Sequence, residues 1–273
     1  MNDPYLDPHS GILRNEFGIT NQRELDSREA DAVGVRSVMI QLDPVPGNFD
    51  SKHLKAINEY LFQDVYDWAG TFRTISLSKR DHVGGQVTHF SPADVIEAEL
   101  QAVLGELAED NFLRSLPRKV FANKMAQLFS EMNRIHPFRE GNGRAQRQFV
   151  RQLAQGSYKP HFDVVSKERL VTASIASAHG DNSMLERMMD EITDTERIQP
   201  LKKLIAFFGR ERYEWNDRYI ATTTPGQRYR GTFAQAAGDD FFFYDDQNRI
   251  VVGKTSDLPT AARANDKIDF EAS

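Results

Sequence analysis

The middle of the chain places apolar residues at the spacing of an α-helix that is buried along one face. These positions alternate steps of four and three residues: Phe121, Met125, Leu128, Met132 and Ile135. The pattern predicts a helix that ends at His136, because Pro137 disfavours helical backbone in the residue before it. A tight turn follows, and helical spacing returns from Asn142 onward.

Helical patterns also cover most of residues 50–209, which predicts a mainly α fold, a helical bundle. Further helices are expected near 22–42, 92–110, 166–178, 183–194 and 200–214. Ser51 and Ser91 have the side chain of a helix N-cap, and Pro92 suits a first helical turn.

One stretch, 71–90, follows a strand pattern instead. Ile75 and Leu77 alternate with polar residues, and 87–90 reads as a return strand after Gly84-Gly85. This arrangement predicts a β-hairpin.

The composition changes after Trp215 to short strands separated by turns. Strands are expected at 219–222, 229–233, 241–244 and 249–252. Their regular spacing predicts a small β-barrel of the OB type. Acidic residues outnumber basic ones by nine to seven in 216–273, so we interpret the aromatic run 241–244 as core rather than as a base-stacking surface. The predicted domains are an N-terminal arm and helix (1–50), a helical core with the hairpin at 71–90 (51–214) and the barrel (215–273).

The formal net charge of −6 argues against a general nucleic-acid binder. The chain has no cysteine, which excludes a disulfide framework and a cysteine nucleophile. No apolar run reaches the roughly 20 residues of a membrane-spanning helix. We therefore expect a soluble protein made in a cytosol, with no nucleic-acid partner and no membrane span.

Residues 136–147 (HPFREGNGRAQR) concentrate the chemistry of the chain. Gly141 and Gly143 open a helix, where unpaired N–H groups and the helix dipole attract an anion. Arg144 and Arg147 have the fork that suits phosphate oxygens. A carboxylate beside phosphates, here Glu140, is a typical Mg²⁺ ligand. His136 has the pKa of a general base near neutral pH.

This segment resembles the signature of the Fic family, His-x-Phe-x-Asp/Glu-Gly-Asn-Gly-Arg-x-x-Arg, at every fixed position. The resemblance implies an enzyme that transfers AMP from ATP, with Mg²⁺, to a Tyr, Thr or Ser hydroxyl of a target protein. It implies that His136 is the base and that Glu140 binds the metal. The residues implied in nucleotide binding are Phe138, Gly141, Asn142, Gly143, Arg144 and Arg147, of which the two arginines also act in catalysis.

The run Trp68-Ala-Gly-x-x-Arg73 followed by a hairpin is also similar to the Fic family. The resemblance implies that the hairpin is a flap whose edge docks an extended segment of the target by strand addition. The implied docking residues are Ile75, Ser76, Leu77, Ser78, Lys79 and Arg80. We expect the polar insert 79–82 to bias the choice of target.

A helical core followed by a small barrel resembles the Bartonella effector proteins within that family. That resemblance implies a bacterial protein translocated into a host cell by a type IV secretion system. Such effectors usually carry a further delivery domain, so we expect a shortened relative or a piece of a longer protein.

Many Fic proteins carry an inhibitory glutamate that pairs with the second arginine of the motif, here Arg147. Only Thr20 to Glu24 partly fits that pattern, and Leu25 breaks it. We therefore expect a separate small antitoxin chain to supply the glutamate. Two alternatives to AMP transfer stay open: transfer of UMP, phosphocholine or phosphate, and an inactive module that binds a target.

Overall fold

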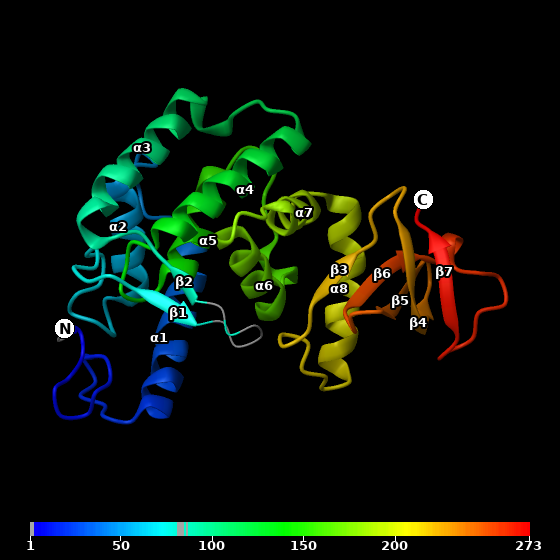
Figure 1. Ribbon diagram of the computed structural model, residues 1–273, viewed down its shortest axis with the longest axis horizontal. Helices are drawn as coiled ribbons and strands as arrows, with labels where there is room; N and C mark the ends of the chain where they lie inside the picture. Colours follow the sequence, from blue (N-terminus) through cyan, green and yellow to red (C-terminus); the bar gives the residue numbers. More distant parts are fainter. Residues whose placement is uncertain (1–2, 81–84, 86) are drawn as a thin grey trace. The chain divides into compact units, whose positions relative to one another are not determined.

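The computed structural model describes residues 3–80, 85 and 87–273, which divide into two compact units, Met1–Lys159 and Pro160–Ser273 (Figure 1). This division is drawn at a different place from the predicted boundary near 214, because three helices group with the C-terminal sheet. The predicted division into functional domains stays a prediction. Each unit is described by itself below.

Unit 1 is a bundle of five α-helices within its described residues, with a two-stranded hairpin. Its elements are α1 (Gln22–Leu42), α2 (Ser51–Phe62), β1 (Ser78–Arg80), β2 (Val87–His89), the 3₁₀ turn η1 (Ala93–Val95), α3 (Ile96–Glu109), η2 (Asn111–Leu113), α4 (Arg118–Ile135) and α5 (Asn142–Leu153). α5 packs against α2 and α4, and α1 packs against α2 and α5 (Figure 1). The functional motif therefore joins two helices in the centre of the unit.

The predicted apolar stripe of α4 is confirmed. All five stripe residues, from Phe121 to Ile135, are at most 6% exposed, and the helix ends where the sequence predicts. The predicted helix start at Asn142 is also confirmed. Burial of the stripe explains why α4 holds its C-terminal end, and His136 after it, at a fixed place in the core.

Two predicted N-caps were wrong. Asp50, one residue before Ser51, caps α2 by accepting a hydrogen bond from the His53 N–H at 2.8 Å. Ser91 caps no helix, because its hydroxyl is bonded to Glu99 and Arg134. The chain passes through η1 before α3 begins, so the predicted helix 92–110 starts later than expected.

The hairpin is shorter than predicted. β1 pairs antiparallel with β2, with Ser78 opposite His89, whereas Ile75 and Leu77 lie before β1. The prediction of a strand at Ile75 was wrong because the core anchors this segment: the Ile75 carbonyl accepts from Arg73 at 2.6 Å. Part of the predicted connection and insert, 81–84, lies outside the described residues.

Unit 2 combines helices with a five-stranded sheet within its described residues. Its elements are η3 (Phe162–Val164), α6 (Lys167–Ala178), α7 (Ser183–Ile192), α8 (Thr195–Arg210), β3 (Ile220–Thr222), β4 (Arg228–Ala237), β5 (Asp240–Asp245), β6 (Ile250–Lys254), η4 (Thr255–Asp257) and β7 (Lys267–Glu271). α8 begins five residues before its predicted start, because Asp194 caps it and Pro200 lies inside the helix.

The strand order in this sheet is β3-β6-β5-β4-β7, with β3 parallel to β6 and the other pairs antiparallel. No pairing joins β3 to β7 in the part of the chain that the structure describes, so the predicted closed barrel is not confirmed. The strand β7 was missed by the sequence analysis, although Ile268 and Phe270 alternate there with charged residues.

One buried cluster of unit 2 lies on the sheet. The buried cluster consists of Phe233, Phe241, Phe243, Val251, Ile268, Phe270 and Ala272. Phe242, on the opposite face of β5, contacts the rings of Phe207 and Phe208 in α8. The interpretation of the aromatic run 241–244 as core is therefore confirmed for Phe241 and Phe243.

Among the described residues, no helix combines the length and the apolar character needed to cross a membrane.

Candidate active site

His136 is held in an unusual backbone conformation at the end of α4. Its φ and ψ of 50° and 62° lie in the left-handed region, which disfavours residues with a side chain. Arg73, only 2% exposed, fixes this turn: its Nε donates to the His136 carbonyl at 2.8 Å, and its backbone N–H donates to the Pro137 carbonyl at 2.9 Å. The surroundings thus impose the conformation that turns the chain away from the helix.

The imidazole of His136 is 7% exposed and stacks on the Phe90 ring, with 3.8 Å between centroids and 12° between planes. Burial lowers the pKa of His136 well below its ordinary value of 6.5, and the positive charges of Lys79 and Arg73 lower it further. The backbone of Asn133 opposes this shift only weakly. The imidazole is therefore neutral at physiological pH and able to accept a proton.

The turn after His136 is closed by the side chain of Asn142. Its Oδ1 accepts from the Phe138 N–H at 2.8 Å, and its Nδ2 donates to the Phe138 carbonyl at 2.7 Å. Phe138 itself is 1% exposed and packs near Phe72. The structure therefore places the Phe138 and Asn142 side chains in the architecture of the turn, where Asn142 binds both backbone groups of Phe138.

Gly141 is the residue that lets α5 begin here. Its φ is 84°, and a Cβ on it would lie 2.1 Å from the Phe62 ring, so a side chain is excluded. No side chain caps α5 at Gly141. The N–H groups of the first turn, Asn142 to Arg144, are therefore orphan donors at the positive end of the helix.

The two motif arginines have different surroundings. Arg144 Nη2 lies 2.7 Å from Glu29 Oε1 and 3.1 Å from Glu140 Oε1. Within the described residues, Arg147 has no hydrogen bond or ion pair. Burial, with Arg151 and Arg144 nearby, lowers its pKa to about 10. A cation that burial and like charges disfavour is well suited to pair with an incoming anion.

Glu140 is suited to supply one carboxylate ligand of a magnesium site. Its Oε1 accepts from the Gly141 N–H at 2.8 Å and from Arg144, whereas no bond to its Oε2 is found in the described part of the chain. That part also holds no cluster of three or more His, Cys, Asp or Glu that could bind a metal. One carboxylate beside a phosphate site agrees with the way proteins bind Mg²⁺, which takes its other ligands from phosphate and water.

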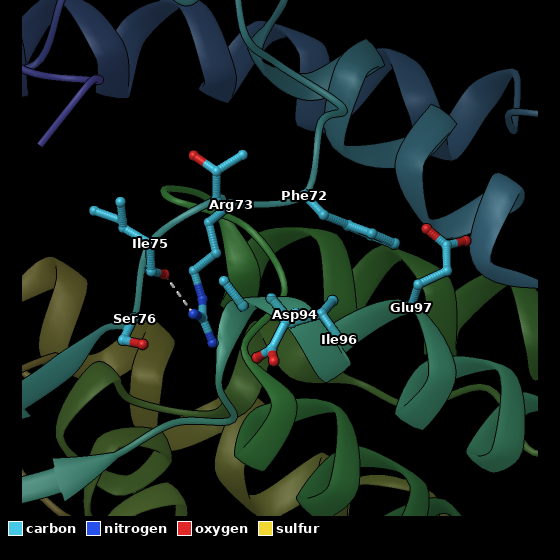
Figure 2. A pocket seen from close by; sticks show the side chains of 9 residues that line it. Phe72, Arg73, Ile75, Ser76, Asp94, Ile96 and Glu97 are labelled. Atoms are coloured by element: carbon cyan, nitrogen blue, oxygen red, sulfur yellow. Dashed lines mark hydrogen bonds between the residues drawn. The ribbon is translucent and has the colours of Figure 1, made fainter.

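The predicted docking residues lie on and before β1. Ser78, Lys79 and Arg80 are in the strand and exposed, and Ile75 to Leu77 precede it. Ile75 and Ser76, but not Leu77, line a cavity of about 590 Å³ together with Asp94, Ile96 and Glu97 (Figure 2). Figure 2 shows the Ile75 carbonyl bonded to the Arg73 guanidinium, with Asp94 and Glu97 coming from the other wall.

Four site residues were missed by sequence reasoning. Phe90 stacks on the base, and Asn58 Nδ2 donates to the Glu140 carbonyl at 3.2 Å. Glu29 and Tyr66 lie behind Arg144. Asn58 gave a signal, a polar residue among the apolar positions of α2, but Glu29 sits far from the motif in the sequence. Glu24, weighed as an inhibitory residue, lies exposed in the first turn of α1.

The site lies at the turn that joins α4 to α5. It combines a histidine with left-handed backbone, a glycine turn and an uncapped helix start with two arginines. These are the parts of a phosphate-binding enzyme site. The model of the Fic/DOC family matches residues 48–154, which contain all of these elements. A probable protein adenylyltransferase Fic of Escherichia coli K12 is 32% identical over 70% of this chain and 92% of its own length. The chain belongs to the Fic/DOC family.

Comparison with Bartonella proteins extends the similarity beyond the motif. A protein adenylyltransferase of Bartonella henselae is 30% identical over 98% of this chain but only 52% of its own length, so the chain spans about half of that relative. The solved structure of the type IV secretion system effector protein BepA superposes with a TM-score of 0.88, at 29% identity, over 98% of this chain and 95% of that one. The solved Fic domain of a Bartonella quintana effector with bound ADP has a TM-score of 0.64, at 32% identity, over 69% of this chain and 93% of that one.

Proposed function

We propose that the protein is an adenylyltransferase that transfers AMP from ATP to a Tyr, Thr or Ser hydroxyl of a target protein. The observation that carries this proposal is Arg147, a half-buried cation without a counter-charge among the described residues, beside the uncapped start of α5. A polyphosphate supplies the missing negative charge. A neutral His136 stands at the other end of the same turn.

In the proposed reaction, His136 takes the proton of the target hydroxyl. The hydroxyl oxygen forms a bond to the α-phosphorus of ATP, and the bond from that phosphorus to the α–β bridging oxygen breaks. Pyrophosphate leaves with the electron pair. The N–H groups of the first turn of α5, with Arg144 and Arg147, neutralise the charge on the phosphates and the leaving group.

Glu140 would hold Mg²⁺ together with phosphate oxygens, and the ion would supply charge neutralisation on the leaving pyrophosphate. The Glu140 carboxylate is oriented for this by Gly141 and Arg144. Relatives named as protein adenylyltransferases and a relative with bound ADP support the nucleotide as substrate.

The test is labelling of a host-cell lysate with α-³²P-ATP and Mg²⁺, wild type beside His136→Ala. We expect a labelled protein band that falls by about 10²- to 10⁴-fold in the variant, the usual contribution of a general base. Label from UTP or GTP instead of ATP would change the donor and keep the class of enzyme. Absence of label with every nucleotide would contradict the proposal. It would leave transfer of phosphate or phosphocholine, which the α-label does not report, and a module that only binds its target.

For the target, we propose docking by strand addition along the flap. β1 and β2 form a two-stranded sheet in the described residues, so each has an outer edge, which supports this proposal. The cavity beside Ile75 and Ser76 would receive a side chain of the docked segment. A Lys79→Ser/Arg80→Ser variant should lower target labelling and spare self-labelling. Equal loss of both would show that these residues do not select the target.

Two further parts of the proposal concern biology. A small antitoxin chain would block the site by placing a glutamate against Arg147, and tagged protein expressed with its neighbouring genes should copurify with it.

The similarity to BepA, whose name describes a type IV secretion system effector, supports translocation into a host cell. A reporter fused to the protein and followed in infected cells tests that step.

A further inference from the structure

Glu29 lies on the packed face of α1 although it is charged. The buried residues of this helix are Leu25, Val33 and Ile40, and Glu29 is four residues from both Leu25 and Val33, so it shares their face. Its side chain is 14% exposed. α1 packs against α2 and α5 (Figure 1), and the contact of Glu29 with Arg144 brings a carboxylate from the N-terminal helix to the motif.

Both oxygens of this carboxylate are occupied. Oε1 lies 2.7 Å from Arg144 Nη2, and Oε2 accepts a hydrogen bond from the Tyr66 hydroxyl. Tyr66 is 2% exposed and stacks on Trp68, with 4.3 Å between ring centroids. The Glu29 side chain is therefore held in one orientation by a rigid aromatic partner.

Arg144 is held on one side only. Its guanidinium lies over the Phe62 ring at 4.4 Å, and Nη2 makes both of its carboxylate contacts. Nε and Nη1 make no hydrogen bond within the described residues, and the side chain is 29% exposed. Donors thus remain for a phosphate while the plane of the guanidinium is fixed.

We infer that Glu29, held by Tyr66, is a positioning residue that orients Arg144 for the nucleotide phosphates before the nucleotide binds. The inference rests on the proposed function. An arginine that is already ordered loses less conformational entropy when it binds phosphate. The N-terminal helix is then a part of the active site, and not only a support for it.

The experiment compares Glu29→Ala, Glu29→Gln and Tyr66→Phe with wild type, by calorimetric titration of ADP with Mg²⁺ and by the KM and kcat of AMP transfer. Loss of one ordered side chain corresponds to about 3- to 10-fold weaker binding. We expect that loss in Kd and KM for Glu29→Ala, a smaller loss for Tyr66→Phe and near wild-type values for Glu29→Gln, which keeps an acceptor oxygen. Asp31→Ala, at an exposed position of the same helix, is the matched control.

Charge and position predict opposite results. If Glu29 only opposed the phosphates by its negative charge, both Glu29→Ala and Glu29→Gln would bind ADP more tightly, and this would overturn the inference. Unchanged binding in Glu29→Ala would overturn it as well. Loss of binding that persists in Glu29→Ala on an Arg144→Ala background would assign the effect to helix packing instead.

The two levels of the argument can fail separately. ADP binding that follows the expected order, without AMP transfer by wild type, would contradict the proposed reaction and keep the positioning role. Normal AMP transfer by wild type, with no effect of Glu29→Ala on binding or transfer, would keep the proposed reaction and contradict the positioning role. Thermal unfolding of each variant identifies any that is unfolded. Glu29→Gln, which replaces one carboxylate oxygen by an amide nitrogen of similar size, then carries the comparison with Tyr66→Phe.

Discussion

Each unit of the chain contains an arginine–glutamate pair, and the two pairs differ in what surrounds them. In unit 2, Arg169 and Glu191 are both 0% exposed. In unit 1, the side chains of Arg144 and Glu29 are 29% and 14% exposed. The first pair is sealed from solvent, whereas the second leaves donors where a ligand can reach them.

The buried pair links helices to the sheet within unit 2. Glu191 in α7 accepts from the backbone and the hydroxyl of Thr222 in β3, and lies 3.7 Å from Arg197. Burial alone would raise the pKa of Glu191, but the charges of Arg169 and Arg197 and the Thr222 hydrogen bonds outweigh it and lower the pKa. The comparison indicates that an ion pair open on one side keeps donors available for a ligand, whereas a pair with both side chains fully buried links elements of the fold.

The largest expected effect comes from breaking the sealed pair. Glu191→Ala leaves the Arg169 charge buried without its partner, which should lower the free energy of unfolding of unit 2 by about 3–5 kcal/mol. Urea denaturation followed by circular dichroism measures the loss. The double variant Arg169→Met/Glu191→Leu should recover most of it, because apolar residues of similar volume remove both charges. A double variant as unstable as the single one would contradict this account.

A second buried arginine, Arg73, has carbonyl partners instead of a carboxylate, so it tests whether such partners alone stabilise a buried guanidinium. It binds the carbonyls of Ile75, Ser91, Ile135 and His136, and burial lowers its pKa. Arg73→Lys cannot reach four carbonyls from one planar fork, so we expect a loss of about 1.5–3 kcal/mol in unfolding free energy.

Because Arg73 also holds the His136 turn, AMP transfer should fall further than the unfolded fraction explains. Activity measured well below the unfolding transition separates the two effects. Activity equal to wild type at such a temperature would show that the turn keeps its conformation without Arg73.

The sequence was sufficient for those parts of the fold and site that are local. The stripe of α4 and the start of α5 follow from periodicity and a glycine turn, and residues 136–147 carry their chemistry within one segment. Apart from Asn58, a polar residue among the apolar positions of α2, the residues that join distant segments of the site gave no local signal. Glu29 reads as one more polar residue of α1. Arg73 could be recognised as part of a motif, but not as the residue that binds the Ile75 carbonyl, so that the strand begins at Ser78 instead of Ile75.

The missed strand β7 and the unconfirmed barrel have a related cause. Alternation at Ile268 and Phe270 indicates a strand, but nothing in the spacing of strands states which edges pair. β7 pairs with β4, a partner more than 30 residues away in the sequence, and closure of a sheet depends on such pairings rather than on the number of strands.

The pH dependence of AMP transfer tests the surroundings of His136, in the unit that contains the open Arg144–Glu29 pair. The pKa of His136 is lowered by burial and by Lys79 and Arg73, so the imidazole stays neutral as the pH falls below its ordinary pKa of about 6.5. The acid limb of kcat/KM should therefore lie below that pH. Lys79→Ala removes one positive charge and should move the limb toward higher pH, whereas Lys79→Arg should not. Protonation of ATP is common to all three proteins and cancels in the difference. Identical limbs in all three would exclude Lys79 as a cause.

The smallest effect is expected for an exposed pair on the same helix as Glu29. Arg36 in α1 binds Asp64 through Nε and Nη2, both at 2.7 Å, with side chains 25% and 47% exposed. Such a pair contributes about 0.2–1 kcal/mol in water, so Asp64→Ala should lower the unfolding free energy of unit 1 only slightly. The difference should shrink when NaCl is raised to about 1 M, because salt screens exposed charges.

This pair also separates attachment of α1 from positioning of Arg144. Asp64→Ala loosens α1 without touching the motif, so its KM for ATP should equal that of wild type, while Glu29→Ala raises KM. If Asp64→Ala raised KM as much as Glu29→Ala, the phosphate site would depend on how firmly α1 is attached. The orientation that Glu29 gives to the Arg144 guanidinium would then have no separate role, and openness on one side would no longer distinguish the ligand-binding pair from the structural one.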